Sequence, residues 1–106
     1  MLRDDFSDIE IAVLDNLSNV QDPEVGFDIV SLGLIYDVRH MGEGHVVVTM
    51  TLSTKACPMH DLMLSWAEEA TLNSEGVSTC DIDLVWEPEW SIDMANDLVK
   101  RELGAF

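Results

Sequence analysis

The length, composition and charge of this chain exclude several classes of protein. Its 106 residues are enough for one hydrophobic core, so we expect a single domain over residues 1–106. A hydrophobic share of 47% indicates a folded protein, and no apolar run is long enough to cross a membrane. The 21 acidic residues against 5 basic ones give a formal net charge of -16, which disfavours nucleic acid as a partner because it repels phosphate backbones.

The start of the chain and its two cysteines indicate a reducing, cytoplasmic setting. The stretch MLRDDFSDIE is acidic and lacks the apolar centre of a secretory signal. Cys57 and Cys80 form no C-x-x-C pair, so a closed structural zinc site is not expected. Thiols stay reduced in the cytoplasm, and we therefore expect both cysteines to be free.

The first predicted element is a helix over about residues 7–20. Ser7 and Glu10 have the spacing of a capping box at its start. Pro23, Gly26 and Gly33 then interrupt helical structure, and the apolar content of QDPEVGFDIVSLG predicts an ordered loop. The apolar residues of the helix share one stripe: Ile9, Val13, Leu17 and Val20.

Three strands are predicted from alternating apolar and polar residues. The runs LIYDVRH and HVVVTMTLS, separated by the turn MGEG, predict an antiparallel hairpin over residues 34–53. In CDIDLVW, Ile82 and Leu84 alternate with Asp81 and Asp83, which predicts a third strand. The second run places alternate residues on one face: Val46, Val48, Met50 and Leu52.

Helical spacing returns after Pro58 and predicts a second helix that ends near NSEG. Strand, helix and strand in that order favour a right-handed parallel crossover. Ser91 is placed to cap a third helix, which Gly104 ends. The order helix-strand-strand-helix-strand-helix predicts an α+β fold with a small mixed three-stranded sheet covered by helices. The second helix has these residues at helical spacing: Met59, Leu62, Met63, Trp66, Ala67 and Ala70.

The stretch STKACPMHDLM carries the candidate chemistry. Pro58 suits the first position of a helix because its missing N–H would have no intrahelical partner, and this leaves Cys57 near the N-cap. Amide N–H groups and the helix dipole favour a thiolate there, so we expect the pKa of Cys57 to lie below that of a free thiol. Lys55 adds to this effect, whereas Asp22 opposes it. Cys80, beside core positions of a strand, is expected to be a packing residue.

Different classes of function fit a reactive Cys57. Cys57, His60 and Asp22 can be arranged as a nucleophilic triad, which predicts a thiol-dependent hydrolase or transferase. A thiolate is also the ligand that iron prefers in clusters, which are usually held by four of them. Because one chain offers only Cys57 in a suitable place, binding of iron or a cluster would need a second copy or another protein. A structural acidic interaction module is a third interpretation, and it requires Cys57 to be dispensable.

Three segments resemble, in order and spacing, the SufT/PaaD-type iron-sulfur assembly proteins: DPEVGFDIVSLGLIYDV, VTMTLSTKACPMHDLM and GVSTCDIDLVWEPEWSIDMA. The resemblance runs from about Gln21 to Gly104. It implies an α+β fold and a role in maturing iron-sulfur proteins or, in one branch, the metal-containing parts of an aromatic-ring oxygenase. That branch typically carries a cysteine-rich C-terminal extension, which is not found before the chain ends at Phe106, so the general assembly branch is favoured.

By this resemblance the functional site falls on Asp22, Glu24, Ser53, Thr54 and Cys57, with Cys57 as the metal ligand. The sequence departs from the family in the KA that precedes CP, where the family often has a proline. The resemblance implies a transient iron-sulfur cluster or iron as cargo, and scaffold or client proteins as partners. It implies no turnover chemistry. We therefore expect an assembly adaptor rather than an enzyme, with a homodimer as one way to complete the ligand set.

Overall fold

A computed structural model gives the fold of residues 6–22, 26–52, 60–91, 94–97 and 101, and for His60 it describes the backbone alone. The strand order is β1-β2-β3, with β1 antiparallel and β3 parallel to β2. The predicted hairpin, the parallel third strand and the α+β class are thereby confirmed. The elements in chain order are α1 (Asp8–Leu17), β1 (Ile35–Gly42), β2 (His45–Met50), α2 (His60–Leu72) and β3 (Thr79–Leu84).

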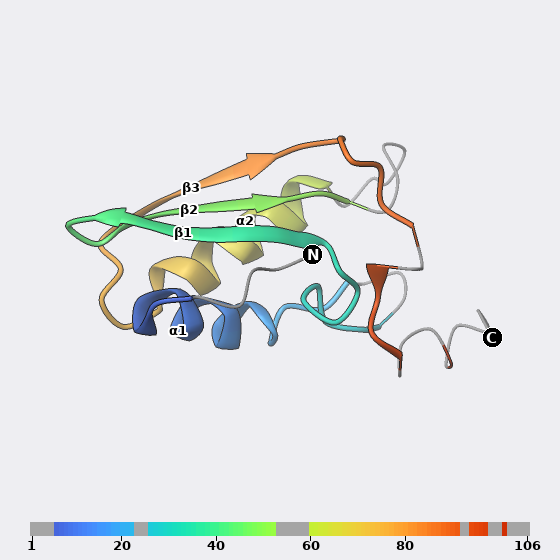
Figure 1. Ribbon diagram of the computed structural model, residues 1–106, viewed down its shortest axis with the longest axis horizontal. Coiled ribbons are helices and arrows are strands. Elements are labelled where there is room, and N and C mark those ends of the chain that lie inside the picture. The colour runs from blue at the N-terminus through green and yellow to red at the C-terminus, as the bar shows by residue number, and fades with distance from the viewer. Residues whose placement is uncertain (1–5, 23–25, 53–59, 92–93, 98–100, 102–106) are drawn as a thin grey trace.

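Both helices lie on the same side of the sheet (Figure 1). On that side Val46, Val48 and Met50 of β2 are fully buried, as the alternation predicts. On β3 the residues that point the other way, Asp81 and Asp83, are exposed. The fold thus has two layers, and no described helix covers the outer face of the sheet. None of the described helices is long and apolar enough to span a membrane.

The hairpin turn between β1 and β2 consists of Glu43 and Gly44. Their φ angles are 53° and 77°, and positive φ at both central residues is what a type I′ turn requires. A Cβ on Gly44 would lie 2.7 Å from the Ser78 hydroxyl oxygen, so this position needs glycine for space as well as for conformation. His40 Nε2 accepts a hydrogen bond from the Gly44 N–H at 3.1 Å, which ties the turn to β1.

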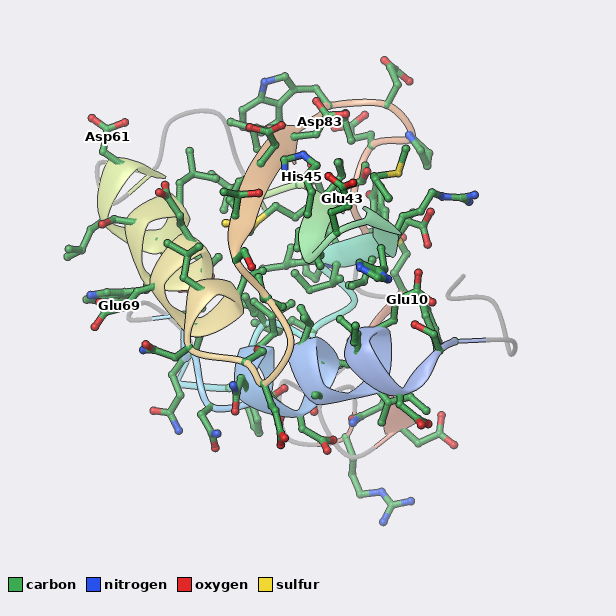
Figure 2. The ribbon with its side chains drawn as sticks, turned by 90° about the vertical axis from the view of Figure 1, so that its left-hand side faces the viewer. Glu10, Glu43, His45, Asp61, Glu69 and Asp83 are labelled. Atoms are coloured by element: carbon green, nitrogen blue, oxygen red, sulfur yellow. The ribbon has the colours of Figure 1, made fainter. Side chains whose placement is uncertain are left out.

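Helix α1 is held at its start by the predicted capping box. The Ser7 hydroxyl accepts a bond from the Glu10 N–H at 3.3 Å, and Glu10 Oε1 accepts one from the Ser7 N–H at 2.8 Å. Glu10 is only 6% exposed, and its second oxygen, Oε2, accepts a bond from the His40 N–H at 2.7 Å (Figure 2). One carboxylate therefore caps α1 and fastens it to β1.

Helix α2 packs against the sheet through Met63, Ala67 and Thr71, all of which are buried. Leu62 shares the predicted helical spacing but is 40% exposed. The buried face of α2 is centred on Met63 and Ala67, and Leu62 lies at the margin of that face. The expected beginning of this helix, at residues 58 and 59, lies outside the described residues. Most of the predicted third helix also falls outside them, so that helix stays a prediction.

The segment after β3 runs back across the molecule to the loop that precedes β1. Trp90 Nε1 donates to the Leu32 carbonyl at 2.7 Å, and the Asn96 N–H donates to the Ser31 carbonyl at 2.8 Å. Gly33 has a φ of 79°, and a Cβ there would collide with the backbone of Met94. These contacts confirm that the described part of the predicted loop is ordered, and they show why glycine is needed at position 33.

Replacing Glu10 by Ala is expected to lower the free energy of unfolding by about 2–3 kcal/mol, because it leaves the Ser7 and His40 N–H groups without their acceptor. Urea unfolding followed by circular dichroism measures the change. Glu69→Ala, at an exposed position of α2, is the control and should change stability by about 0.5 kcal/mol or less. Equal stability of the two variants would contradict the role assigned to Glu10.

Candidate functional site

The predicted site begins at Asp22, which lies in a loop that folds back on itself. Asp22 is 3% exposed. Its N–H donates to the Phe27 carbonyl at 2.9 Å, and its carbonyl accepts from the Gly26 N–H at 2.8 Å. Gln21 and Asp28 form an antiparallel bridge beside it. The backbone around Asp22 is therefore fixed by hydrogen bonds, and the residue is part of the folded body.

A series of backbone hydrogen bonds joins this loop to the end of β2. The Ile29 N–H donates to the Val20 carbonyl at 2.9 Å, and the Leu34 N–H donates to the Ile29 carbonyl at 3.0 Å. The Thr51 N–H then donates to the Leu34 carbonyl at 2.9 Å. The loop that contains Asp22 is thus bonded to the strand end from which the chain continues to Ser53.

The other predicted site residues, Glu24, Ser53, Thr54 and Cys57, lie outside the described residues, as does the side chain of His60. The described chain leaves the sheet after β2 and resumes at the start of α2. Cys57 therefore falls in the connection between a strand and a helix, as the sequence predicts. Its position relative to Asp22 and its place at a helix N-terminus stay predictions.

Two polar residues that the sequence analysis did not identify lie near the end of β2: Thr51, which is buried, and Tyr36, which is half-buried. Thr51 is 1% exposed, and its Oγ1 has no hydrogen-bond partner of good geometry among the described residues. The Tyr36 hydroxyl donates to the Pro88 carbonyl at 2.7 Å. Burial raises the pKa of Tyr36, and the nearby Thr51 hydroxyl partly offsets this rise.

The Thr51 hydroxyl is a candidate for a role in the site. A buried polar atom without a partner costs about 1–3 kcal/mol, which a valine at this position would avoid. The residue also stands directly before the segment that leads to Ser53 and Cys57. Alternation along the strand places Thr51 on the face opposite the core, and no sequence signal predicts that it is buried there.

No metal site is complete in the part of the chain that the structure describes. Within residues 6–22, 26–52, 60–91, 94–97 and 101, no three His, Cys, Asp or Glu side chains come together in a way that would hold a metal ion. Asp22 contributes an oxygen ligand at most. The predicted metal ligand, Cys57, lies outside the described residues.

Cys80 is a free, half-buried thiol near α2. Its Sγ donates to the Glu68 carbonyl at 3.8 Å. Burial raises the pKa of this thiol, and the negative charges of Glu68 and Asp81 raise it further. A thiol with a raised pKa carries less thiolate at neutral pH than an ordinary thiol, so Cys80 is a weaker nucleophile there.

The raised pKa of Cys80 gives a testable titration. In a Cys57→Ser protein, the alkylation rate of Cys80 should reach half its maximum at a pH above about 8.5, the ordinary value for a thiol, because only the thiolate reacts. Asp81→Asn should move this midpoint downward by removing one of the charges that raise it. A midpoint at or below that of a free thiol would contradict the assignment. The measurement is the rate of iodoacetamide labelling, followed by mass spectrometry.

Comparison with known proteins identifies the family. The sequence matches the family described as iron-sulfur cluster assembly protein over residues 10–83. It is 36% identical over 103 residues to the Fe-S protein maturation auxiliary factor of Porphyromonas gingivalis, covering 97% of this chain and 98% of that protein. It is also 36% identical over 85 residues to the Fe-S protein maturation auxiliary factor SufT of Staphylococcus aureus, covering 80% of this chain and 97% of the relative.

The fold agrees with this assignment. The crystal structure of a domain of unknown function, DUF59, from Bacillus anthracis superposes with a TM-score of 0.85 at 35% sequence identity. The match covers 92% of this chain and 93% of that one. The resemblance to SufT-type proteins is thereby confirmed, and the chain belongs to the family of iron-sulfur cluster assembly proteins.

Proposed function

We propose that this protein assists the delivery of iron or an iron-sulfur cluster to client proteins, and that Cys57 is the residue that receives the cargo. Membership of the assembly family supports the general role. The observation that carries the choice of site is the backbone connection between the loop of Asp22 and the end of β2, which leads to Cys57. The reducing cytoplasm is the setting we propose, because there the thiol stays free.

A carboxylate and a thiol, such as Asp22 and Cys57, suit the binding of a metal ion better than nucleophilic attack on a substrate. A carboxylate close to a thiol disfavours the thiolate until a cation arrives and neutralises both charges. Iron-sulfur clusters are held mainly by thiolates, usually four, and this chain offers one in the proposed site. The remaining ligands would come from a second copy, a scaffold or a client, so the cargo would be passed on by exchange of ligands.

This role makes the protein an adaptor and not an enzyme. The alternative, a thiol-dependent hydrolase or transferase, needs His60 as a general base for Cys57. The names of the relatives, which are maturation auxiliary factors, favour the adaptor. The two functions differ in what they require of His60, and this difference can be measured.

In cells that depend on this protein, Cys57→Ser should lower the activity of iron-sulfur enzymes to the level of cells that lack the protein. Cys80→Ser, the same chemical change at the packing thiol, should leave that activity unchanged. His60→Ala should also leave it largely intact, because an adaptor needs no general base. The measurement is the specific activity of iron-sulfur enzymes in extracts, with each variant's abundance checked by immunoblot.

Two results would contradict the proposal. Full activity of iron-sulfur enzymes in Cys57→Ser cells would show that the function does not require Cys57. A loss in His60→Ala cells as severe as that in Cys57→Ser cells would favour the enzyme over the adaptor.

A homodimer is expected when iron is bound. Because each chain supplies one thiolate in the proposed site, two copies that share a cluster would supply two of the usual four ligands. Size-exclusion chromatography with light scattering under anaerobic conditions, with and without iron, measures this association. If the protein stays monomeric at high concentration in both conditions, the homodimer is wrong, and the remaining ligands would have to come from another protein.

A further inference from the structure

The two edges of the sheet differ, because carboxylates accept hydrogen bonds from the outward-facing N–H groups of β1. On the outer side of β1, the His40 N–H donates to Glu10 Oε2 at 2.7 Å. The Val38 N–H, two residues earlier and therefore on the same side of the strand, donates to Asp37 Oδ1 at 2.9 Å. Both donors are occupied, so this edge offers little to an incoming strand.

Among the described residues, no strand pairs with the backbone donors and acceptors on the outer edge of β3. The Thr79 N–H donates to the Gly44 carbonyl at 3.3 Å, and the Val85 N–H donates to the Met50 carbonyl at 2.9 Å. Alternation along a parallel strand then directs the N–H and C=O groups of Cys80, Ile82 and Leu84 away from β2. No strand among the described residues pairs with that side, where Figure 1 shows β3 at the margin of the sheet.

An acidic groove runs beside this edge, between β3 and α2, with a volume of about 430 Å³. Among the residues that the structure describes, its charged lining residues are Asp61, Glu68 and Asp81, and none of the lining residues is basic. Leu64 and Ile82 supply apolar surface. The groove therefore suits a long side chain with an aliphatic stem and a positive end, which describes lysine and arginine.

We propose that the outer edge of β3 and this groove bind an extended, lysine- or arginine-containing segment of a partner protein. Added as a strand, such a segment would bond with the backbone groups of Cys80, Ile82 and Leu84, while a basic side chain enters the groove. The charge of the chain, -16, favours a basic partner. This inference is independent of the role proposed for Cys57.

Charge disfavours a second copy of this chain as the occupant. Antiparallel pairing of β3 with itself would bring the exposed carboxylates of Asp81 and Asp83 from the two copies into opposition. Like charges placed directly opposite each other destabilise a pair of strands. A basic segment turns the same residues into attractive contacts.

Amide hydrogen exchange by NMR tests the proposed strand addition. The probe is a short synthetic peptide in which Lys and Val alternate, and the control peptide has the same sequence with every backbone amide N-methylated, which keeps the charge but removes the N–H groups that would pair. We expect the Lys-Val peptide to slow exchange at Cys80, Ile82 and Leu84. Exchange at Val38 and His40, whose N–H groups are already bonded to carboxylates, should not change.

A matched pair of variants on α2 tests the groove. Glu68 lines the groove, whereas Glu69 lies on the side of α2 that faces away from the sheet (Figure 2). At constant ionic strength, Glu68→Lys should weaken binding of the Lys-Val peptide about tenfold, and Glu69→Lys, with the same change in charge, about twofold or less. The dissociation constants come from NMR titrations, whose spectra also show that each variant is folded.

Three outcomes would overturn the proposal. They are unchanged exchange at the outer amides of β3, equal weakening by the two lysine variants, and equal binding of the N-methylated peptide. The last two would mean that the peptide is attracted by net charge without occupying the edge. Slower exchange at β3 with rising protein concentration, in the absence of peptide, would show instead that a second copy binds there.

Discussion

The carboxylate of Glu10 is the contact on which the arrangement of the other elements depends. It accepts hydrogen bonds from the Ser7 N–H at the start of α1 and from the His40 N–H on β1. A buried carboxylate is tolerable only when such donors replace water. The contact sets α1 against the sheet, where Val13 and Leu17 join the core, and it also occupies the outer edge of β1. The other edge of the sheet is β3, and no described strand pairs with its outer side.

The proposed site is supported by elements from both ends of the chain. The loop of Asp22 is bonded to β2 through Leu34 and Thr51, while Trp90 and Asn96 hold the same loop from the C-terminal side. Such bracing keeps a binding loop in one arrangement before its ligand arrives, which reduces the conformational cost of binding. The acidic groove lies between α2 and β3, and Asp22 is not among its described lining residues.

Local sequence signals predicted the elements of this fold well, because each has a chemical cause within a few residues. The capping box at Ser7, the glycine-containing hairpin turn and the alternation of β2 are of this kind. Contacts between distant segments were not predictable. The bond from Glu10 to His40, the burial of Thr51 and the exposure of Leu62 all depend on how the elements pack.

The candidate site shows the same division. The sequence predicted Asp22 and Cys57 as site residues, and their role stays a prediction. The described bounds of β2 and α2 place position 57 between a strand and a helix in the chain. The sequence did not identify Thr51 or the open edge of β3. The first depends on tertiary burial, and the second depends on which strand ends up at the margin of the sheet, which follows from topology and not from local pattern.

The central claim is that Cys57 receives the metal, and anaerobic reconstitution tests it most directly. Wild-type protein, Cys57→Ser and Cys80→Ser would each be incubated with ferrous iron and sulfide, desalted, and measured for bound iron and for the visible absorption of thiolate-bound clusters. The account predicts bound iron and this absorption in the wild type and in Cys80→Ser, and neither in Cys57→Ser. Equal iron and equal absorption in Cys57→Ser and the wild type would contradict it.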